Sequence, residues 1–168
     1  MRIRRPWWWV GSGAVLILAV TPHSTHRVEL IYNPSVSAPR GWYALSKTTR
    51  FEVDDYALVT LPVPARRLAD VRHYLPQTVP LLKQIAAVNP QFVCVRAGSM
   101  WVDGILVATA LSRDGKGRPL DAWRGCRLLA ANELLLVGRE NPVSFDSRYF
   151  GPVRRDSVIG KAVPVWTW

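Results

Sequence analysis

Two serines and one lysine, in separate stretches of the chain, are the residues whose types and surroundings could support covalent chemistry. Ser35 and Ser37 lie in the stretch NPSVSAPRGWY (residues 33–43), and Lys83 is the single charged residue of the apolar run LLKQIAAV (residues 81–88). A serine hydroxyl is a good nucleophile only when a neighbouring base takes its proton, and a lysine serves as that base only when it is held neutral. These residues predict acyl transfer, with a serine of the first stretch as nucleophile and Lys83 as base.

Neutrality of Lys83 is the energetic requirement of this chemistry. An unperturbed lysine has a pKa near 10.4, so a neutral amine at pH 7 costs about 4–5 kcal/mol, and burial lowers a lysine pKa by up to about 3–5 units. A strand through the run would place three apolar side chains on the face of this lysine: Leu81, Ile85 and Ala87. The alternative is an edge-strand lysine whose amine reaches water.

A third stretch, SFDSRYFGPV (residues 144–153), brings Ser144, Asp146 and Arg148 together ahead of a glycine. Asp146 could act in catalysis, or it could pair with Arg148 or form an Asx turn, and the sequence leaves these roles open. A serine two residues before a proline is common in loops, so Ser37 taken alone is a weak candidate. The hypothesis of a Ser/Lys site depends on all three stretches together.

Short runs of β-branched and aromatic residues predict that a mainly antiparallel β domain carries these groups. The predicted strands, besides the lysine run, are residues 28–32, 42–45, 56–61, 92–95, 105–109 and 134–137. Asp103 and Gly104 are a two-residue hairpin signal, and residues 112–119 (SRDGKGRP) have the composition of a loop.

One segment departs from this β pattern. Residues 64–74 carry Leu68 and Val71, with Leu75 just beyond, at helical spacing and with prolines on both sides. This spacing predicts a short helical excursion beside the sheet.

The first 22 residues have the composition of a membrane-targeting segment. Residues 1–6 carry three arginines, and residues 7–20 carry no charge. As a helix the apolar stretch spans roughly 21 Å, short of the ~30 Å hydrocarbon core, so a cleavable signal peptide competes with an uncleaved anchor. We favour the anchor, because no small-residue cleavage site follows. This predicts a basic flank and transmembrane anchor helix in residues 1–22 and an exported catalytic domain in residues 23–168.

Cysteine and charge content add three expectations. Cys94 and Cys126 lack CxxC spacing and the three histidines are isolated, so we expect neither a metal site nor another cofactor. In an oxidising compartment the two cysteines would form a disulfide, the alternative being two buried thiols. The net charge of +10 comes from scattered basic residues without a long run, so we expect no nucleic-acid partner.

Together these stretches resemble the signal peptidase I family, and within it the conjugal-transfer pilin peptidases of the TraF type. The pattern N-x-S-x-S-x-P-x-G-x-Y over residues 33–43 is similar to that branch, as are residues 94–104 and 117–127. SFDSRYFGPV followed by IGKA (residues 159–162) is similar to the wider family. The resemblance runs from residue 33 to the C-terminus and implies a signal-peptidase-like antiparallel β domain.

The resemblance also implies a role for each candidate in the first two stretches. Ser37 would be the nucleophile and Lys83 the general base. Ser35 would supply a hydroxyl that helps bind the oxyanion.

In the third stretch, the resemblance implies that Ser144 and Asp146 support the lysine and the site. Asp146 is proposed as directly catalytic in the TraF branch. Arg148 would be structural and hold the loop in place.

The implied function is that of a membrane-anchored serine endopeptidase that processes, and possibly in this branch cyclises, the pilin precursor of a conjugative (type IV secretion) system. The expected partners are that precursor and the bacterial cytoplasmic membrane, which the chain would cross once with its N-terminus inside and its catalytic domain in the periplasm. Two alternatives stay open: a general or accessory signal peptidase, and a non-catalytic anchored β-scaffold of the transfer channel.

Two turns depart from the family pattern. Residues 89–91 (NPQ) stand where the family has Gly-Asp after the lysine, and residues 139–141 (REN) stand where it has Gly-Asp-Asn. Both departures concern loop geometry more than the Ser/Lys pair.

Overall fold

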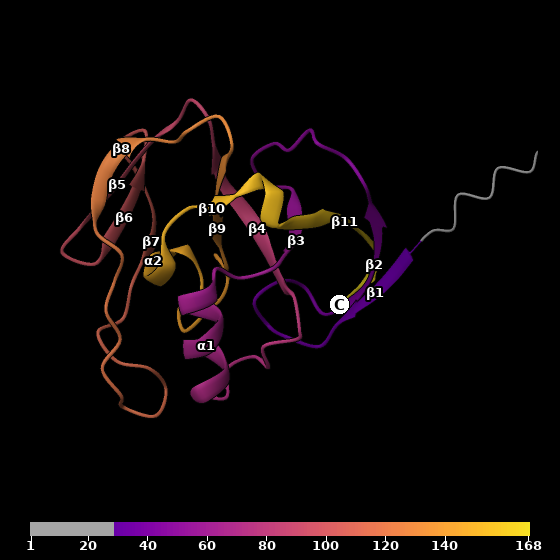
Figure 1. The fold of residues 1–168 in the computed structure, drawn as a ribbon, viewed down its shortest axis with the longest axis horizontal. Helices are drawn as coiled ribbons and strands as arrows, with labels where there is room; N and C mark the ends of the chain where they lie inside the picture. The colour runs from indigo at the N-terminus through magenta and orange to yellow at the C-terminus, as the bar shows by residue number, and fades with distance from the viewer. Residues whose placement is uncertain (1–28) are drawn as a thin grey trace, which may run out of the picture.

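A computed structural model describes residues 29–168 as two antiparallel β-sheets with two short helices and a 3-10 turn (Figure 1). The mainly antiparallel β domain expected from the sequence is confirmed. The predicted anchor, residues 1–22, lies outside the described residues. Within residues 29–168 no helix is long and apolar enough to cross a membrane.

The larger sheet has seven strands in the order β1-β2-β11-β3-β4-β9-β10. Their bounds are β1 Glu29–Asn33, β2 Gly41–Ser46, β3 Tyr56–Val59, β4 Leu81–Val88, β9 Glu133–Val137, β10 Val153–Arg154 and β11 Val158–Thr167. The C-terminal strand β11 enters between β2 and β3, and β4 lies between β3 and β9. The strand that carries the candidate base is therefore an interior strand.

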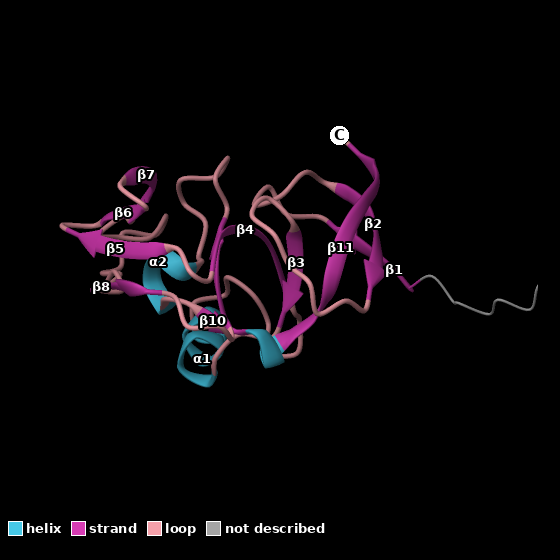
Figure 2. Cartoon of the chain, turned by 90° about the horizontal axis from the view of Figure 1, so that it is seen from above, coloured by secondary structure: helices cyan, strands magenta, loops and turns pink. Residues whose placement is uncertain are grey.

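The smaller sheet has four strands in the order β7-β6-β5-β8 and lies at the opposite end of the molecule from β1 and β2 (Figure 2). Its strands are β5 Phe92–Arg96, β6 Ser99–Val102, β7 Ile105–Thr109 and β8 Gly125–Leu128. Between β6 and β7, Asp103 and Gly104 both have positive φ, 48° and 81°, which confirms the predicted hairpin turn. One apolar core cluster joins the two sheets through buried side chains of β4, β5, β6 and β9.

The helix α1, Val63–Val71, confirms the predicted helical excursion. Its buried residues are Ala65 and Ala69, while Val71, one of the apolar residues at helical spacing, is 73% exposed. Two alanines four residues apart bring the helix backbone close to the core, because they occupy little space. The second helix, α2, is a single turn, Ser147–Phe150, and the 3-10 turn η1 spans Arg155–Ser157.

Cys94 and Cys126 form a disulfide, as expected. They are direct partners on the neighbouring strands β5 and β8, so strand pairing brings them together across a separation of 32 residues.

We expect the double replacement Cys94→Ala and Cys126→Ala to lower the free energy of unfolding by about 3–4 kcal/mol, the loop-closure entropy of a ring of this length. Urea unfolding of the variant and of the unmodified, disulfide-bonded chain measures the difference. Reduction of the unmodified chain should give a similar loss, and a change below about 1 kcal/mol in both would contradict the expectation.

Candidate active site

The first candidate stretch forms the loop between β1 and β2, which we call the nucleophile loop (residues 34–40). Asn33, the last residue of β1, organises it and is buried. Its Nδ2 donates to the carbonyl oxygens of Ser35 (3.0 Å), Ala38 (3.1 Å) and Pro39 (3.0 Å). Its Oδ1 accepts from the backbone N–H (3.1 Å) and the hydroxyl (2.9 Å) of Ser35. One amide therefore fixes both ends of the loop that presents Ser37.

Asn33 is the first residue of the pattern over residues 33–43, but nothing in the sequence indicates its role. A polar residue at the end of a strand is ordinary, and its value here depends on five contacts that only the closed loop creates. Tyr43, fully buried on β2, adds a further contact by donating its hydroxyl to the carbonyl oxygen of Pro39 at 2.7 Å.

We expect Asn33→Leu to lower kcat by about 10- to 100-fold with a smaller effect on KM, because a displaced nucleophile reacts poorly even when substrate binds. Asn33→Asp should recover part of the loss, since it keeps the acceptor for Ser35. Steady-state cleavage kinetics measures both. The exposed Asn132 is a matched control, and an Asn132→Leu variant that loses as much activity would contradict a positioning role for Asn33.

Lys83 supplies the buried amine of the site. It lies on β4, hydrogen-bonded on both sides to β3 and β9, and is 2% exposed. The edge-strand alternative is therefore wrong. Burial lowers the pKa of Lys83 to about 8; the Asp146 carboxylate acts in the opposite direction and the Arg148 guanidinium lowers it further. A substantial fraction of Lys83 is thus neutral near pH 8.

The predicted strand over residues 81–88 is confirmed, and its burial is more complete than simple alternation gives. Ile85 and Ala87 are fully buried, but Leu82 and Ala86, which alternate with them, are buried too. The strand has layers of side chains on both faces, and its pairing with β9 shifts between Ile85 and Ala87. Lys83 is therefore covered by neighbouring strands along both edges of β4 and by side chains packed on the faces of the sheet.

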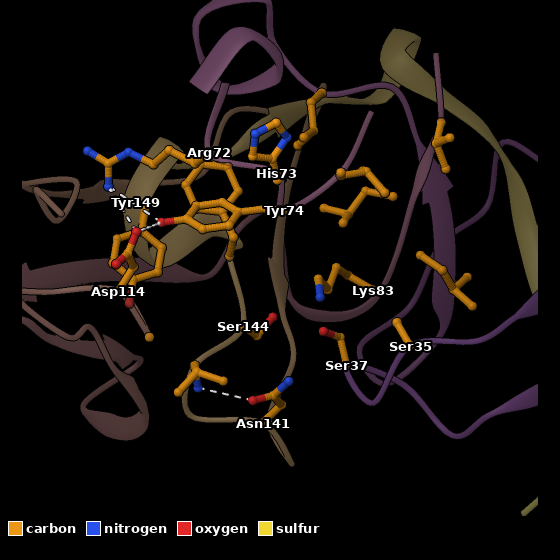
Figure 3. A pocket seen from close by; sticks show the side chains of 18 of the residues that line it. Ser35, Ser37, Arg72, His73, Tyr74, Lys83, Asp114, Asn141, Ser144 and Tyr149 are labelled. Carbon is orange, nitrogen blue, oxygen red and sulfur yellow. Dashed lines mark hydrogen bonds and ion pairs between the residues drawn. The ribbon is translucent and has the colours of Figure 1, made fainter. Parts of the chain in front are cut away.

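The third stretch brings Ser144 to the same place. Figure 3 shows the Lys83 amine and the hydroxyls of Ser37 and Ser144 directed toward one space. A methyl group at Gly138 would lie 2.6 Å from Ser144 Oγ and 3.2 Å from the carbonyl oxygen of Ser37, so both loops pass close to this glycine. Ser144 Oγ is buried without a hydrogen-bond partner in the described part of the chain. Its hydrogen-bonding capacity is therefore free for a neighbouring group such as the lysine amine.

Asp146 is fully buried, and its four acceptor positions are used. Oδ1 accepts from the backbone N–H (3.1 Å) and Nε (2.8 Å) of Arg148, and Oδ2 accepts from Arg148 Nη2 (2.8 Å) and the backbone N–H of Gly138 (2.9 Å). Asp146 does not line the cleft that contains Ser37 and Lys83. This geometry favours a positioning role over direct catalysis.

Arg148, 2% exposed, closes the loop between β9 and α2. Its guanidinium donates to four carbonyl oxygens at 2.9–3.2 Å: those of Thr109, Asn141, Pro142 and Ser144. The loop thus surrounds a buried ion pair, and the position of Ser144 depends on it.

These groups share one cleft of about 700 Å³, which Ser35, Ser37, Lys83 and Ser144 line. Apolar side chains of β1, β3 and β4 form much of its wall around the lysine. A hydroxyl beside an amine of lowered pKa, in such a cleft, is an arrangement suited to nucleophilic attack on a carbonyl.

The chain belongs to the signal peptidase family, peptidase S26, whose model matches residues 7–168. The resemblance inferred from the sequence is therefore confirmed. Among individual relatives, the Plasmid transfer protein TraF of Escherichia coli is 33% identical over 91 residues, a match that covers 52% of this chain and 51% of that protein. The Probable conjugal transfer protein TraF of Sinorhizobium fredii (strain NBRC 101917 / NGR234) is 34% identical over 146 residues, covering 81% and 76%.

The chain thus spans about half the length of the Escherichia coli relative and about three quarters of the Sinorhizobium fredii one. Among solved structures, a signal peptidase I from Enterococcus faecalis V583 matches 67% of this chain and 96% of its own, with 18% identity and a TM-score of 0.39.

Proposed function

We propose that this protein is a serine endopeptidase in which Ser37 is the nucleophile and Lys83 the general base. The observation that carries the proposal is a lysine 2% exposed, with its pKa lowered to about 8, in the same cleft as a serine hydroxyl directed toward it. Membership of a peptidase family supports this assignment.

In the proposed reaction, neutral Lys83 takes the proton of Ser37 Oγ as that oxygen attacks the carbonyl carbon of a peptide bond. The resulting lysinium then gives its proton to the leaving nitrogen, the C–N bond breaks, and an ester on Ser37 remains. Water, or an amine in its place, then attacks the ester while neutral Lys83 takes its proton; the lysinium returns that proton to Ser37 Oγ as the ester C–O bond breaks, and the product is released. Lys83 thus carries the proton in both steps, so no second acid is needed.

Backbone N–H groups of the nucleophile loop and the Ser35 hydroxyl would bind the oxyanion. One such donor typically stabilises the transition state by about 3–4 kcal/mol. In the structure that hydroxyl donates to Asn33 Oδ1 and must turn to reach an oxyanion. Ser35 is therefore a secondary donor. Ser144 Oγ is buried without a hydrogen-bond partner among the described residues and is directed toward the same space as the amine, so it can accept from Lys83 and keep it aimed at Ser37.

Activity should follow the neutral fraction of Lys83. We expect kcat/KM to rise with pH through about 8 and to level off above it, because only the deprotonated amine accepts a proton; at pH 6 it should be about 100-fold below the plateau. A pH profile with a peptide ending in alanine before the cut tests this. A flat profile from pH 6 to 9, or a rise centred near the ordinary lysine pKa, would contradict it.

An aromatic face supports work at a membrane surface. Tyr32 on β1 contacts Trp42 on β2 (ring centroids 5.2 Å) and Trp168 (6.3 Å), and Trp166 contacts Trp168 (5.8 Å). Trp166 and Trp168 are 69% and 64% exposed. Tyr32 lies on β1, which begins at residue 29, a few residues after the predicted anchor (residues 1–22), and exposed tryptophans suit the membrane interface. We infer that the catalytic domain is held against the periplasmic face of the cytoplasmic membrane.

The names of the relatives support a role in conjugal transfer, and we propose that the substrate is the pilin precursor of such a system, cut after a small residue at the exported end of an apolar segment. The test is co-expression of the full chain with a small precursor of that design, followed by mass spectrometry. A shortened product that is absent with Ser37→Ala supports the proposal, and a product lighter than the linear one by one water identifies cyclisation. Equal processing of a soluble precursor without an apolar segment would contradict the substrate assignment.

A further inference from the structure

The cleft has a second end, away from the candidate dyad, which we call the cationic end. It is formed where the segment after α1 meets the loop of residues 112–119. Figure 3 shows Arg72, Tyr74, Asp114 and Tyr149 there, across the cleft from Lys83 and Ser37. One continuous cleft contains both ends.

The cationic end carries more positive than negative charge. Four basic side chains line it: Arg72, Arg113, Lys116 and Arg118. Asp114 is the single acidic residue along the whole described lining of the cleft. One carboxylate cannot neutralise four cations, so the end keeps an excess of positive charge toward any bound molecule.

The carboxylate of Asp114 is buried and holds the surrounding side chains of this end in place. The Asp114 side chain is 4% exposed. It accepts from the Tyr74 hydroxyl, from the backbone N–H groups of Lys116 (2.9 Å) and Arg118 (3.0 Å), and from Arg118 Nε (2.7 Å). Arg72 Nη1 lies 3.6 Å from the same carboxylate, and Arg118 Nη2 donates to the Arg72 carbonyl oxygen at 3.1 Å. The two arginines are thereby held in fixed positions at the cleft wall.

Apolar side chains also line the cleft and suit a peptide. Leu75, Val79, Val143 and Phe145 are among them, and Val79 and Val143 are 45% and 64% exposed. Apolar walls can cover the side chains of a peptide, while a fixed guanidinium pairs well with a carboxylate. A nucleic acid would need a basic surface that follows many phosphates, whereas the basic side chains of this cleft are confined to one end and the rest of its lining is largely apolar.

We propose that the cationic end binds a carboxylate of the substrate peptide, so that the enzyme selects peptides with an acidic group at a fixed distance from the scissile bond. This inference rests on the proposed function, because that function identifies the ligand as a peptide substrate. The carboxylate belongs either to an acidic side chain or to the C-terminus of the peptide.

Binding, rather than cleavage, tests this selection. The probe is a set of fluorescent peptides with alanine before the cut and one glutamate moved through the flanking positions, each with a glutamine twin and each as free acid and amide. Their Kd values are measured by anisotropy on the full-length Ser37→Ala chain in detergent micelles. We expect one glutamate position, or the free acid, to bind about tenfold more tightly than its neutral twin.

Variants locate the effect. Lys116 is exposed, so Lys116→Glu should fold normally and reduce the tenfold preference to about one. Lys47→Glu makes the same charge change at an exposed lysine outside the cleft and should leave the preference intact. Arg118→Gln, which keeps an amide donor for Asp114, should also weaken it.

Three results would overturn the inference. The first is that no peptide in the set binds more tightly than its neutral twin, and the second is that Lys47→Glu removes the preference as fully as Lys116→Glu does. The third is that a short oligonucleotide displaces the acidic peptide at a lower concentration than the unlabelled acidic peptide does. Failure of the proposed function is a separate result: the unmodified chain would then cleave none of these peptides, whether or not the Ser37→Ala chain prefers the acidic ones.

Discussion

Replacing Lys83 by methionine is expected to abolish cleavage and to stabilise the fold at neutral pH. Without its base the serine is inert, so kcat should fall by at least about 10³-fold. The lysine pKa is about 8 in the folded protein against an ordinary 10.5, and this difference corresponds to about 3 kcal/mol. Below pH 8 the lysine is protonated in both states and its burial carries that full cost, so Lys83→Met should raise the free energy of unfolding by a similar amount at pH 7.

The pH dependence of this gain checks its cause. Between pH 8 and 10.5 the unfolded chain binds a proton that the folded chain does not, so the unmodified protein gains stability as pH rises. The advantage of Lys83→Met should therefore fade across this window and vanish near pH 11 in urea titrations. Lys83→Arg should be inactive without being stabilised, because a guanidinium is not deprotonated in this range. Robust cleavage by Lys83→Arg would rule out the lysine as base.

Arg148→Met should be among the most destabilising single changes in the described domain. It leaves the Asp146 carboxylate buried without its partner and removes the donors for four carbonyl oxygens. Breaking a buried ion pair on one side typically costs about 3–5 kcal/mol, and we expect a loss of that size in urea unfolding.

The double variant Asp146→Asn with Arg148→Met is the informative companion, because it removes the unpaired charge. It should recover part of the lost stability but not the activity, since the loop that carries Ser144 is still without its donors. A cost below about 1 kcal/mol for Arg148→Met would show that the ion pair does not hold this loop.

The sequence predicted the elements that carry the candidate dyad because their signals are local. An apolar run with one lysine predicted β4, and Pro39 and Gly41 ahead of the predicted strand at residue 42 indicated the loop that presents Ser37. The sequence predicted apolar neighbours for Lys83 but could not predict its complete burial, because one apolar run does not reveal that β3 and β9 would cover both edges of β4.

Features set by distant contacts were not predictable in the same way. β11 was missed: its ten residues include Gly160 and Pro164, which disrupt the usual strand pattern, and its place between β2 and β3 depends on the whole sheet. Helix α1 was predicted from the spacing of Leu68 and Val71, but which of its residues are buried could not be read from that spacing: the small Ala65 and Ala69 are buried, and Val71 is exposed. For Asp146, the sequence leaves two roles open, and the contacts that favour the positioning role arise only once the loop has closed.

Trapping the acyl-enzyme tests the central claim most directly. The full chain in detergent micelles is mixed with a peptide ester that ends in alanine, quenched in acid within seconds, and examined by intact-mass and peptide-mapping mass spectrometry. The account predicts an added acyl mass on Ser37, formed faster as pH rises through about 8 and absent in Lys83→Met. An adduct on Ser35 or Ser144 instead, or active cleavage with no adduct on any serine, would contradict it.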